Sequence, residues 1–323
     1  MLYRSTNLKT YLFSSKTQLL AFLSFFISSY ERDKIKSYGN QPLKHQPVFI
    51  IGAPRTGSTI VYQALTNLYD VLYIDNLVCK FCRNLFFGFR LDYKIFKDKP
   101  HDNYEADHGN TGRYGLHAPS ECGGFWYRWL PRDHHFIGND EITDAMVVQI
   151  RREIAAVINY FDKPLVFKNL NAGQRIRLLA RCFPEARFVF ITRDPLYTAQ
   201  SILGAKRRIG IADDCFWSVM PKNVDRLKKL DPYAQIANQV YSIEKQIYQD
   251  RSMIRPGHFF QLNYNELSID EIMRLGQSLG FSRRPGKAKT PVLATTETQR
   301  LPDTEFVQLK QEINKLSWNF ESQ

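Results

Sequence analysis

The sequence predicts an α/β protein with a mainly parallel sheet and helices on both faces. Short, fully apolar segments alternate along the chain with longer segments whose apolar residues recur at helical spacing. Parallel strands covered on both faces are apolar throughout, whereas strands with one solvated face alternate with polar residues. The 323 residues, 44% of them hydrophobic, suffice for one large domain or two small ones.

Residues 1–46 are predicted to form an apolar helix and a linker. Residues 19–27 (LLAFLSFFI) are the most apolar stretch, but crossing a bilayer takes about 20 apolar residues, so we predict no transmembrane span. We expect a helix that packs on the domain or lies on a membrane surface, with a cleaved signal peptide as the alternative. A surface helix would give residues 1–30 peripheral contact with the inner membrane surface, and residues 31–47 would be the linker.

The main domain is predicted over residues 47–323 and begins with a strand, a turn and a helix. Residues 48–51 (VFII) are apolar throughout, and apolar residues recur at helical spacing between 60 and 68. Residues 71–74 fit a second short strand. Residues 80–140, in contrast, are rich in Gly, His, Asn, Pro and aromatic side chains without a sustained period, so we expect an irregular insertion of loops and short pieces.

The strand–helix alternation resumes after this insertion. We predict a helix over 142–161, a strand over 165–167, a helix over 174–182, a strand over 187–192, a helix from Pro195, a helix over 234–248, a strand over 258–264 and a helix over 270–279. Pro164 ends the first of these helices, because the residue before a proline is pushed out of the helical region. The fixed φ of Pro195 suits a first helical turn, and Gly280 suits a helix end.

The charge of the chain favours anionic partners. Its 44 Lys and Arg against 32 Asp and Glu give a formal net charge of +12, which suits phosphates, nucleic acid, acidic sugars or a lipid surface. The basic residues are dispersed and no nucleic-acid module is recognisable, so we predict no nucleic-acid partner. The 5 cysteines are too few for a disulfide framework and favour a reducing, cytoplasmic setting. Cys79 and Cys82 form a CxxC without a second ligand pair, and packed thiols are its expected explanation.

Residues 52–59 (GAPRTGST) are a candidate anion-binding loop between the first strand and its helix. Its glycines allow a tight turn in which successive N–H groups and the helix N-terminus point at one anion. The G-x-x-x-x-G spacing matches a Walker A loop, but Ser58 stands where an ATP or GTP hydrolase needs its lysine. The loop therefore predicts a phosphate site without a triphosphate, with Arg55 on the anion. A plain strand–helix turn with an exposed arginine is the alternative.

A second candidate anion site follows the strand predicted over 187–192. Arg193 ends this strand, and Ser201 lies about two helical turns further on, near the same face. Both side chains could hold one phosphate. The alternative is an Asp-Pro helix start with a solvated arginine.

At these residues the sequence resembles the sulfotransferases that use 3′-phosphoadenosine 5′-phosphosulfate (PAPS), in particular their bacterial carbohydrate-type branch, which implies a P-loop NTPase-like sulfotransferase fold. The resemblance covers residues 47–310 and is strongest at 47–68 and 165–203. In this family the 5′-phosphosulfate is bound by the loop positions that match Arg55, Thr56, Gly57, Ser58 and Thr59. The positions that match Arg193 and Ser201 bind the 3′-phosphate.

The resemblance implies roles for further residues. Lys168 matches the family lysine near the transferred sulfuryl group, and a surface lysine with a buried stem is the alternative. Tyr264, in the sequence YNEL, looks like the tyrosine beside the adenosine, and a core aromatic is the alternative. A weak substitute for the family's late Arg-Lys-Gly loop, which would add contacts to the 3′-phosphate, is formed by Arg283, Arg284, Gly286 and Lys287. A solvated basic loop explains these four residues equally.

The general base is the least determined part of the predicted site. Cytosolic small-molecule sulfotransferases carry a catalytic His two positions after this lysine, where the chain has Leu170. Two acids are candidates: Glu121, whose aromatic neighbours could raise its pKa, and Asp75, near the catalytic Glu of related carbohydrate and protein sulfotransferases. We favour Glu121. For each acid a helix cap or a solvated loop carboxylate is the alternative. Lesser candidates are His117, His134 and His135.

The sequence as a whole predicts sulfuryl transfer from PAPS to a hydroxyl acceptor, which we expect to be a carbohydrate or a glycolipid. Arg55, Lys168 and the loop N–H groups would meet the charge that builds on the leaving phosphate, without a metal ion. The insertion at 80–140 would cover the acceptor site. Its aromatic side chains would suit a saccharide or form a hydrophobic cluster under a loop: Trp126, Tyr127 and Trp129. The competing hypotheses are an atypical P-loop kinase or nucleotide hydrolase, and a non-catalytic basic protein that binds membrane or nucleic acid.

Overall fold

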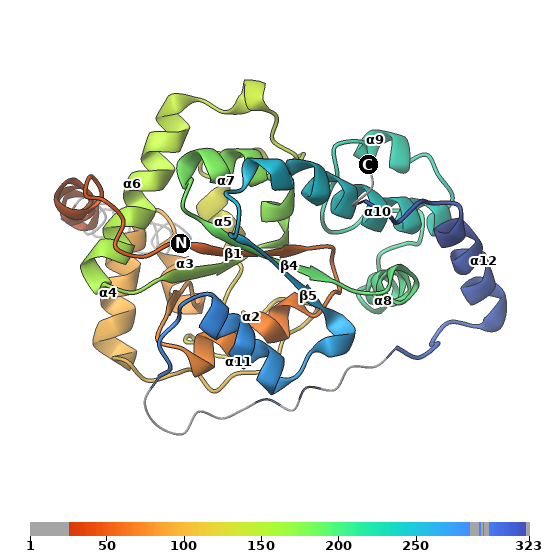
Figure 1. Ribbon diagram of the computed structural model, residues 1–323, viewed down its shortest axis with the longest axis horizontal. Helices are drawn as coiled ribbons and strands as arrows, with labels where there is room; N and C mark the ends of the chain where they lie inside the picture. Colours follow the sequence, from red (N-terminus) through yellow and green to blue (C-terminus); the bar gives the residue numbers. More distant parts are fainter. Residues whose placement is uncertain (1–25, 285–290, 292, 294–296, 321–323) are drawn as a thin grey trace, which may run out of the picture.

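The structure, a computed structural model, describes residues 26–284, 291, 293 and 297–320 of the chain. Within this part of the chain one sheet has the strand order β2-β3-β1-β4-β5, and each neighbouring pair is parallel (Figure 1). The strands are β1 (Val48–Gly52), β2 (Leu72–Tyr73), β3 (Leu165–Lys168), β4 (Arg187–Thr192) and β5 (Phe259–Asn263). The predicted α/β class is confirmed, and each predicted strand is present.

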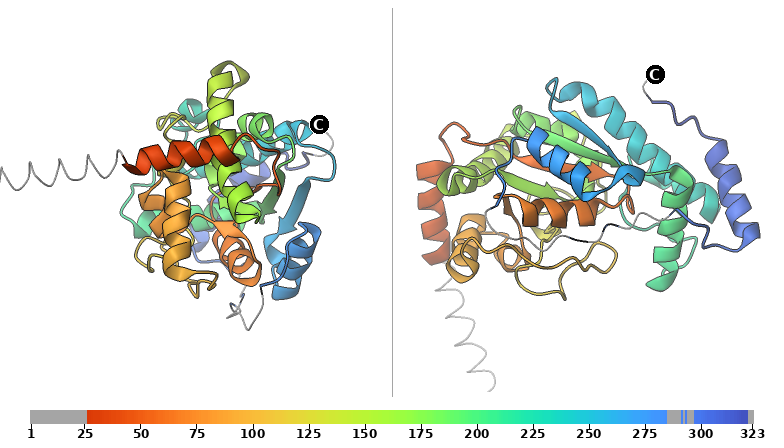
Figure 2. Two further views of the ribbon diagram at one scale, coloured as in Figure 1. Left: turned by 90° about the vertical axis from the view of Figure 1, so that its left-hand side faces the viewer. Right: turned by 60° about the horizontal axis from the view of Figure 1, so that its bottom comes forward.

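Helices cover both faces of the sheet, as the two further views show (Figure 2). One face carries α2 (Ser58–Leu68) and α11 (Ile269–Ser278). The other face is covered by α6 (Asp144–Phe161), α7 (Ile176–Cys182), α8 (Pro195–Arg208), α10 (Pro232–Asp250) and α12 (Asp303–Asn314). Four further helices of the described residues are α3 (Asn76–Lys80), α4 (Leu85–Phe96), α5 (Gly123–Trp126) and α9 (Val224–Leu227).

The central strand β1 explains why its segment is apolar at every position. Phe49 and Ile51 point into the larger hydrophobic core, which lies between the sheet and the layer of α6, α7 and α10. Val48 and Ile50 point into the smaller core under α2 and α11. Successive strand side chains face opposite sides of a sheet, so both sides of β1 are buried and no position is left for a polar residue.

Two segments differ from the sequence prediction because their partners are distant in sequence. Residues 26–38 are helical, although a linker was predicted from residue 31. Residues 85–96 form α4 inside the insertion predicted to be irregular. The buried carboxylate of Glu31 accepts hydrogen bonds from the backbone N–H groups of Phe86 and Phe87, at 2.9 and 2.8 Å, and so caps α4 from outside. A cap supplied by another segment leaves no local signal at the helix start.

The ends of the predicted helices agree with the sequence signals. Asp194 caps α8 through the N–H groups of Leu196 and Tyr197, and Pro195 occupies the first turn. Helix α12 was not predicted. The described residues contain no helix long and apolar enough to cross a membrane. Most of the apolar stretch 19–27 lies outside the described residues, so its role stays a prediction.

Candidate active site

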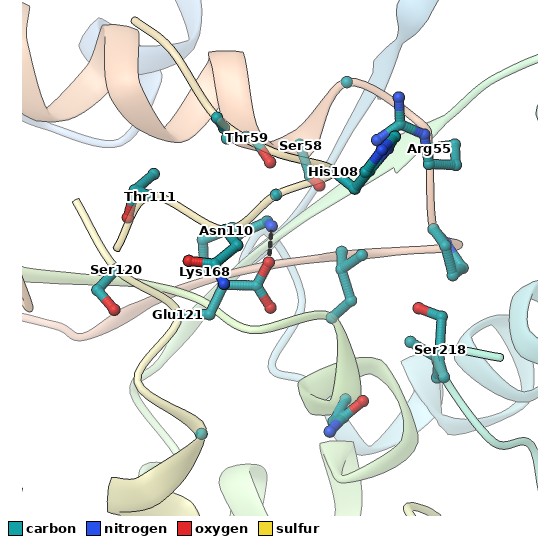
Figure 3. A pocket seen from close by; sticks show the side chains of 18 of the residues that line it. Arg55, Ser58, Thr59, His108, Asn110, Thr111, Ser120, Glu121, Lys168 and Ser218 are labelled. Atoms are coloured by element: carbon teal, nitrogen blue, oxygen red, sulfur yellow. Dashed lines mark hydrogen bonds and ion pairs between the residues drawn. The ribbon is translucent and has the colours of Figure 1, made fainter. Parts of the chain in front are cut away.

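A cavity of about 800 Å³ opens at the carboxyl ends of the parallel strands (Figure 3). Open parallel sheets bind their ligands at this edge. Its walls come from the loop after β1, from the insertion before β3, and from the segments after β3, β4, α8 and β5. Lining residues used below are Arg55, Gly57, Ser58, Thr59, Cys79, Tyr104, His108, Glu121, Cys122, Tyr127, His135, Lys168, Arg193, Trp217 and Tyr264.

The candidate anion loop joins β1 to α2 and forms one wall of the cavity. Gly57 has φ 84 at the N-cap of α2, where no side chain caps the helix. The N–H groups of the first helical turn are therefore left for a ligand, as in other anion-binding helix starts. Ser58 and Thr59 line the cavity, whereas Thr56 is buried beneath it and donates its hydroxyl to the Ala53 carbonyl at 3.0 Å.

We expect Gly57→Ala to destabilise the loop and to weaken binding of 3′,5′-ADP. A Cβ at this position would lie 2.8 Å from Cδ2 of Tyr264, and the positive φ adds about 1–2 kcal/mol of strain. Gly257→Ala is the matched control, because Gly257 has φ 80 but no atom within 4 Å of the added Cβ. Thermal unfolding and nucleotide titration of both variants check this. An equal loss of affinity in the two would contradict it.

The two predicted anion sites lie side by side. The Nε of Arg55 donates to the Ser201 hydroxyl at 3.2 Å, and Nη1 of Arg193 donates to the Arg55 carbonyl at 3.1 Å. The Arg193 guanidinium also stacks on the Tyr264 ring, 4.1 Å from its centroid. Ser201 is not on the cavity wall itself and is reached through Arg55. The structure thus brings together four residues from three segments of the sequence: Arg55, Arg193 with Ser201, and Tyr264.

Two further arginines belong to this cluster and were missed by the sequence analysis. Burial, followed by the nearby charges of Arg208 and Arg193, lowers the pKa of Arg55, and Arg300 acts in the same direction. Arg208 follows Ser201 by about two helical turns on α8, a signal that was available. Arg300 comes from a segment distant in sequence, and its backbone N–H donates to Oε1 of Gln200 at 2.6 Å. Like charges gathered in a partly buried place indicate an anionic ligand.

The late basic segment at 283–287 is not near this cluster. The backbone of Arg283 forms an isolated antiparallel β-bridge with Tyr69, and the backbone N–H of Arg284 donates to the Leu68 carbonyl. Both contacts lie at the far end of α2. The 11 residues of α2 separate this end from the anion loop by about 16 Å, at 1.5 Å per residue. Arg283 and Arg284 therefore do not replace the family's Arg-Lys-Gly loop, and Gly286 and Lys287 lie outside the described residues.

Lys168 and Glu121 form an ion pair on the cavity wall (Figure 3). Lys168 ends β3, the neighbour of β1, and its side chain is only 2% exposed. The Glu121 side chain is 35% exposed, and the amide of Asn169 donates to its backbone carbonyl at 3.2 Å. A buried ammonium needs a partner, and the carboxylate of Glu121 is that partner. Both residues thus line the same cavity, and their catalytic roles stay a prediction.

Asp75, the second candidate base, does not line the cavity. Its carboxylate caps α3 through the Val78 N–H at 2.7 Å and pairs with Nδ1 of His117 at 3.0 Å. Burial raises the pKa of Asp75 to about 7, in the range that suits a base. The same burial leaves the side chain only 1% exposed and out of reach of a ligand. The helix-cap alternative therefore accounts for Asp75. His117 pairs with this carboxylate and likewise does not line the cavity.

The remaining histidines are divided between the cavity and the surface. His134 does not line the cavity, and its Nε2 pairs with Oε2 of Glu141 at 2.7 Å. His135 lines the cavity, but its Nδ1 accepts the Met220 N–H at 2.9 Å, and burial lowers its pKa to about 4. His108, which the sequence analysis did not consider, lies next to Arg55 (Figure 3). Burial, followed by the charges of Arg55 and Arg208, lowers the pKa of His108.

The aromatic residues of the insertion are divided in the same way. Trp126 is buried in the larger core, and Trp129 packs against it, so the hydrophobic-cluster alternative explains both. Tyr127 and Tyr104 line the cavity together with Trp217, which comes from the segment after α8. These three rings supply flat apolar surface beside the polar anion site. Within the described residues, no three metal-ligating side chains of the cavity lie close enough together to share an ion.

The fold and the cavity define a P-loop-like α/β protein with an arginine-rich anion site and a lysine–carboxylate pair. Residues 47–279 match the sulfotransferase family. The match covers most of the chain, so the chain belongs to the sulfotransferase family. The bacterial carbohydrate-type branch that the motifs suggested stays a prediction.

Relatives of the chain include two mycobacterial proteins. Both are named omega-hydroxy-beta-dihydromenaquinone-9 sulfotransferase Stf3, one from Mycobacterium bovis and one from Mycobacterium tuberculosis, and each is 22% identical over 272 residues. The similar region covers 73% of this chain but only 63% of the relatives' length. Among solved structures, sulfotransferase STF9 from Mycobacterium avium has a TM-score of 0.50 and 14% identity, and the alignment covers 90% of this chain and 72% of that one. This last similarity concerns the fold.

Proposed function

We propose that the chain transfers a sulfuryl group from PAPS to the hydroxyl of an amphiphilic acceptor. The observation that carries the proposal is the cavity shared by an arginine cluster and a lysine–carboxylate pair. A nucleotide with a 5′-phosphosulfate and a 3′-phosphate has two separated anionic groups. The anion loop would bind the first, while Arg193 and Ser201, with Arg208 and Arg300 nearby, would bind the second. Tyr264, on which Arg193 stacks, would lie beside the adenosine.

The Lys168–Glu121 pair supports a specific mechanism. The acceptor oxygen attacks sulfur, the new O–S bond forms, and the bond from sulfur to the bridging oxygen of PAPS breaks, which releases 3′,5′-ADP. Arg55, Lys168 and the loop N–H groups stabilise the charge on that bridging oxygen, and Glu121 takes the proton of the hydroxyl. Binding of the phosphosulfate draws Lys168 away from the carboxylate, so Glu121 is released as a base only when the donor is present.

The acceptor side of the proposal rests on the three rings of the cavity wall. Tyr104, Tyr127 and Trp217 provide flat apolar surface, which suits a sugar face or a quinone ring. The mycobacterial relatives are named for sulfation of a hydroxylated dihydromenaquinone, a lipid. We therefore propose a hydroxylated amphiphile as the acceptor, with a glycolipid or a hydroxylated prenyl lipid as the two test compounds and a free carbohydrate as the comparison.

A thermal-shift experiment separates this proposal from its competitors. We expect 3′,5′-ADP to raise the melting temperature, and ATP with Mg²⁺ or an oligonucleotide to have little effect at equal concentration. Ser58, in place of the Walker lysine, is the reason to expect weak ATP binding. Stabilisation by ATP with Mg²⁺ but not by 3′,5′-ADP would favour the kinase or hydrolase hypothesis. Stabilisation by the oligonucleotide alone would favour a basic binding protein.

Sulfuryl transfer is expected to be unaffected by EDTA. The charge on the leaving phosphate is met by Arg55 and Lys168, which are permanent parts of the cavity, so a chelator removes nothing that the reaction uses. Initial rates with and without EDTA, at equal ionic strength, check this. A complete loss of activity that Mg²⁺ or Mn²⁺ restores would contradict it.

A further inference from the structure

The wall of the cavity holds two thiols that the proposed reaction does not use. Cys79 belongs to α3, and Cys122 directly follows Glu121. Both residues line the cavity, and each thiol lies near enough to the other to shift its pKa. Backbone contacts fix the two segments in register, because the Asn76 N–H donates to the Ala118 carbonyl at 3.1 Å and the Ser120 N–H donates to the Ile74 carbonyl at 2.8 Å.

The two thiols differ in a way that suits an attacking and a resolving cysteine. Cys79 is partly exposed and opens on the cavity. The neighbouring Cys122 and Ser120 side chains favour its thiolate and lower the pKa of Cys79, against the opposing effect of burial. Cys122 is buried, and its contact with Cys79 together with burial raises its pKa. A thiolate that solvent can reach, next to a protonated thiol, is the arrangement found at oxidation-sensitive sites.

We propose that Cys79 and Cys122 are a peroxide-sensitive pair that closes to a disulfide on the wall of the active-site cavity. The Cys79 thiolate attacks one oxygen of hydrogen peroxide, so that an S–O bond forms, the O–O bond breaks and hydroxide leaves, which gives a sulfenic acid. The Cys122 thiol then attacks the Cys79 sulfur, the S–S bond forms, the S–O bond breaks, and the oxygen leaves as water with the thiol proton. Two thiols and one peroxide thus give one disulfide and two waters.

The disulfide would act on Glu121 through the chain. Cys122 has φ 41, a conformation that side-chain-bearing residues rarely adopt, so the turn after Glu121 has little freedom to absorb a movement. A disulfide bond is about 2 Å long, shorter than any non-bonded contact between two sulfur atoms, so its formation draws residues 120–123 and α3 towards each other. Glu121 then moves relative to Lys168, and a misplacement of about 1 Å at a catalytic group costs on the order of 10²-fold in rate.

The test is peptide mapping of the full chain after treatment with hydrogen peroxide. We expect the intact mass to fall by two hydrogens, a Cys79–Cys122 cross-linked peptide to appear, and dithiothreitol to reverse both changes. Cys79→Ser and Cys122→Ala should each prevent the cross-link. Cys215→Ser is the matched control, since Cys215 is exposed and does not line the cavity, and it should leave the cross-link intact.

Three outcomes would overturn the proposal. They are a Cys79–Cys82 cross-link, oxidation confined to Cys215, and oxidation of Cys79 to sulfinic acid without any cross-link. The cross-link itself does not depend on the proposed function, whereas its effect on transfer does. If the cross-link forms and 3′,5′-ADP still binds, we expect sulfuryl transfer to fall on the order of 10²-fold and to recover with dithiothreitol. A cross-linked enzyme with unchanged transfer would contradict the effect on Glu121 and leave the thiol pair itself established.

Discussion

Glu121→Gln is expected to lower sulfuryl transfer by about 10²–10⁴-fold, the usual effect of removing a general base. The amide keeps the size of the carboxylate and can still accept a hydrogen bond from Lys168, but it cannot take the proton of the acceptor hydroxyl. Turnover and 3′,5′-ADP affinity should be measured on the same preparation. Affinity is expected to stay within a few-fold of the wild type, because Glu121 does not contact the arginine cluster in the structure.

Asp75→Asn is the matched control for this experiment. It makes the same chemical change at an acid that caps α3 and does not line the cavity. We expect near-normal turnover, with a loss of stability of about 0.5–2 kcal/mol from the weakened cap and its pairing with His117. If Glu121→Gln kept near-normal turnover, the base assignment would be wrong, and His108 and His135 on the cavity wall would be the next residues to test.

Arg55→Ala is expected to abolish transfer and to weaken 3′,5′-ADP binding. The nucleotide would lose a charge-assisted hydrogen bond worth about 1.5–3 kcal/mol, which is about 10- to 150-fold in affinity. Transfer falls further than binding, because Arg55 also meets the charge that develops on the leaving phosphate. The change also removes the hydrogen bond to Ser201 that joins the two anion sites. Isothermal titration and rate measurements give the two quantities.

Two companion variants make the Arg55 result specific. Arg193→Ala should mainly weaken binding, because we place it on the 3′-phosphate, away from the reacting bond. Arg274→Ala removes the same charge from the exposed face of α11, where Arg274 pairs with Glu271, and should change neither quantity. If 3′,5′-ADP affinity were unchanged in both Arg55→Ala and Arg193→Ala, the anion-site assignment would be wrong.

The sheet could be predicted because burial on both faces leaves a strong local signature. Residues 48–51 and 187–192 are apolar almost throughout, and both strands lie in the middle of the sheet. Helix α4 could not be predicted, since its first N–H groups are capped by Glu31 from a separate helix. Local patterns predict elements that are stabilised locally, and they miss those that depend on tertiary contacts.

The candidate site was predictable where it follows a strand end. Lys168 ends β3, and Arg55 and Arg193 follow shortly after the neighbouring strands β1 and β4, so the topology brings all three to one edge of the sheet. Arg300 could not be placed, because it reaches the cluster through the hydrogen bonds of Gln200 to a distant segment. The sequence also could not separate Glu121 from Asp75, since only the tertiary structure distinguishes a cavity wall from a helix cap.

The central claim, sulfuryl transfer from PAPS to a hydroxylated amphiphile, is tested most directly with ³⁵S-labelled PAPS. The full chain is incubated with a short-chain glycolipid, a hydroxylated prenyl lipid or a free carbohydrate, and with the prenyl lipid that lacks the hydroxyl. We predict labelled product and equimolar 3′,5′-ADP with at least one hydroxylated amphiphile, and no label on the compound without the hydroxyl. Label on the free carbohydrate alone would contradict the proposed acceptor, and the absence of both label transfer and 3′,5′-ADP binding would contradict the account as a whole.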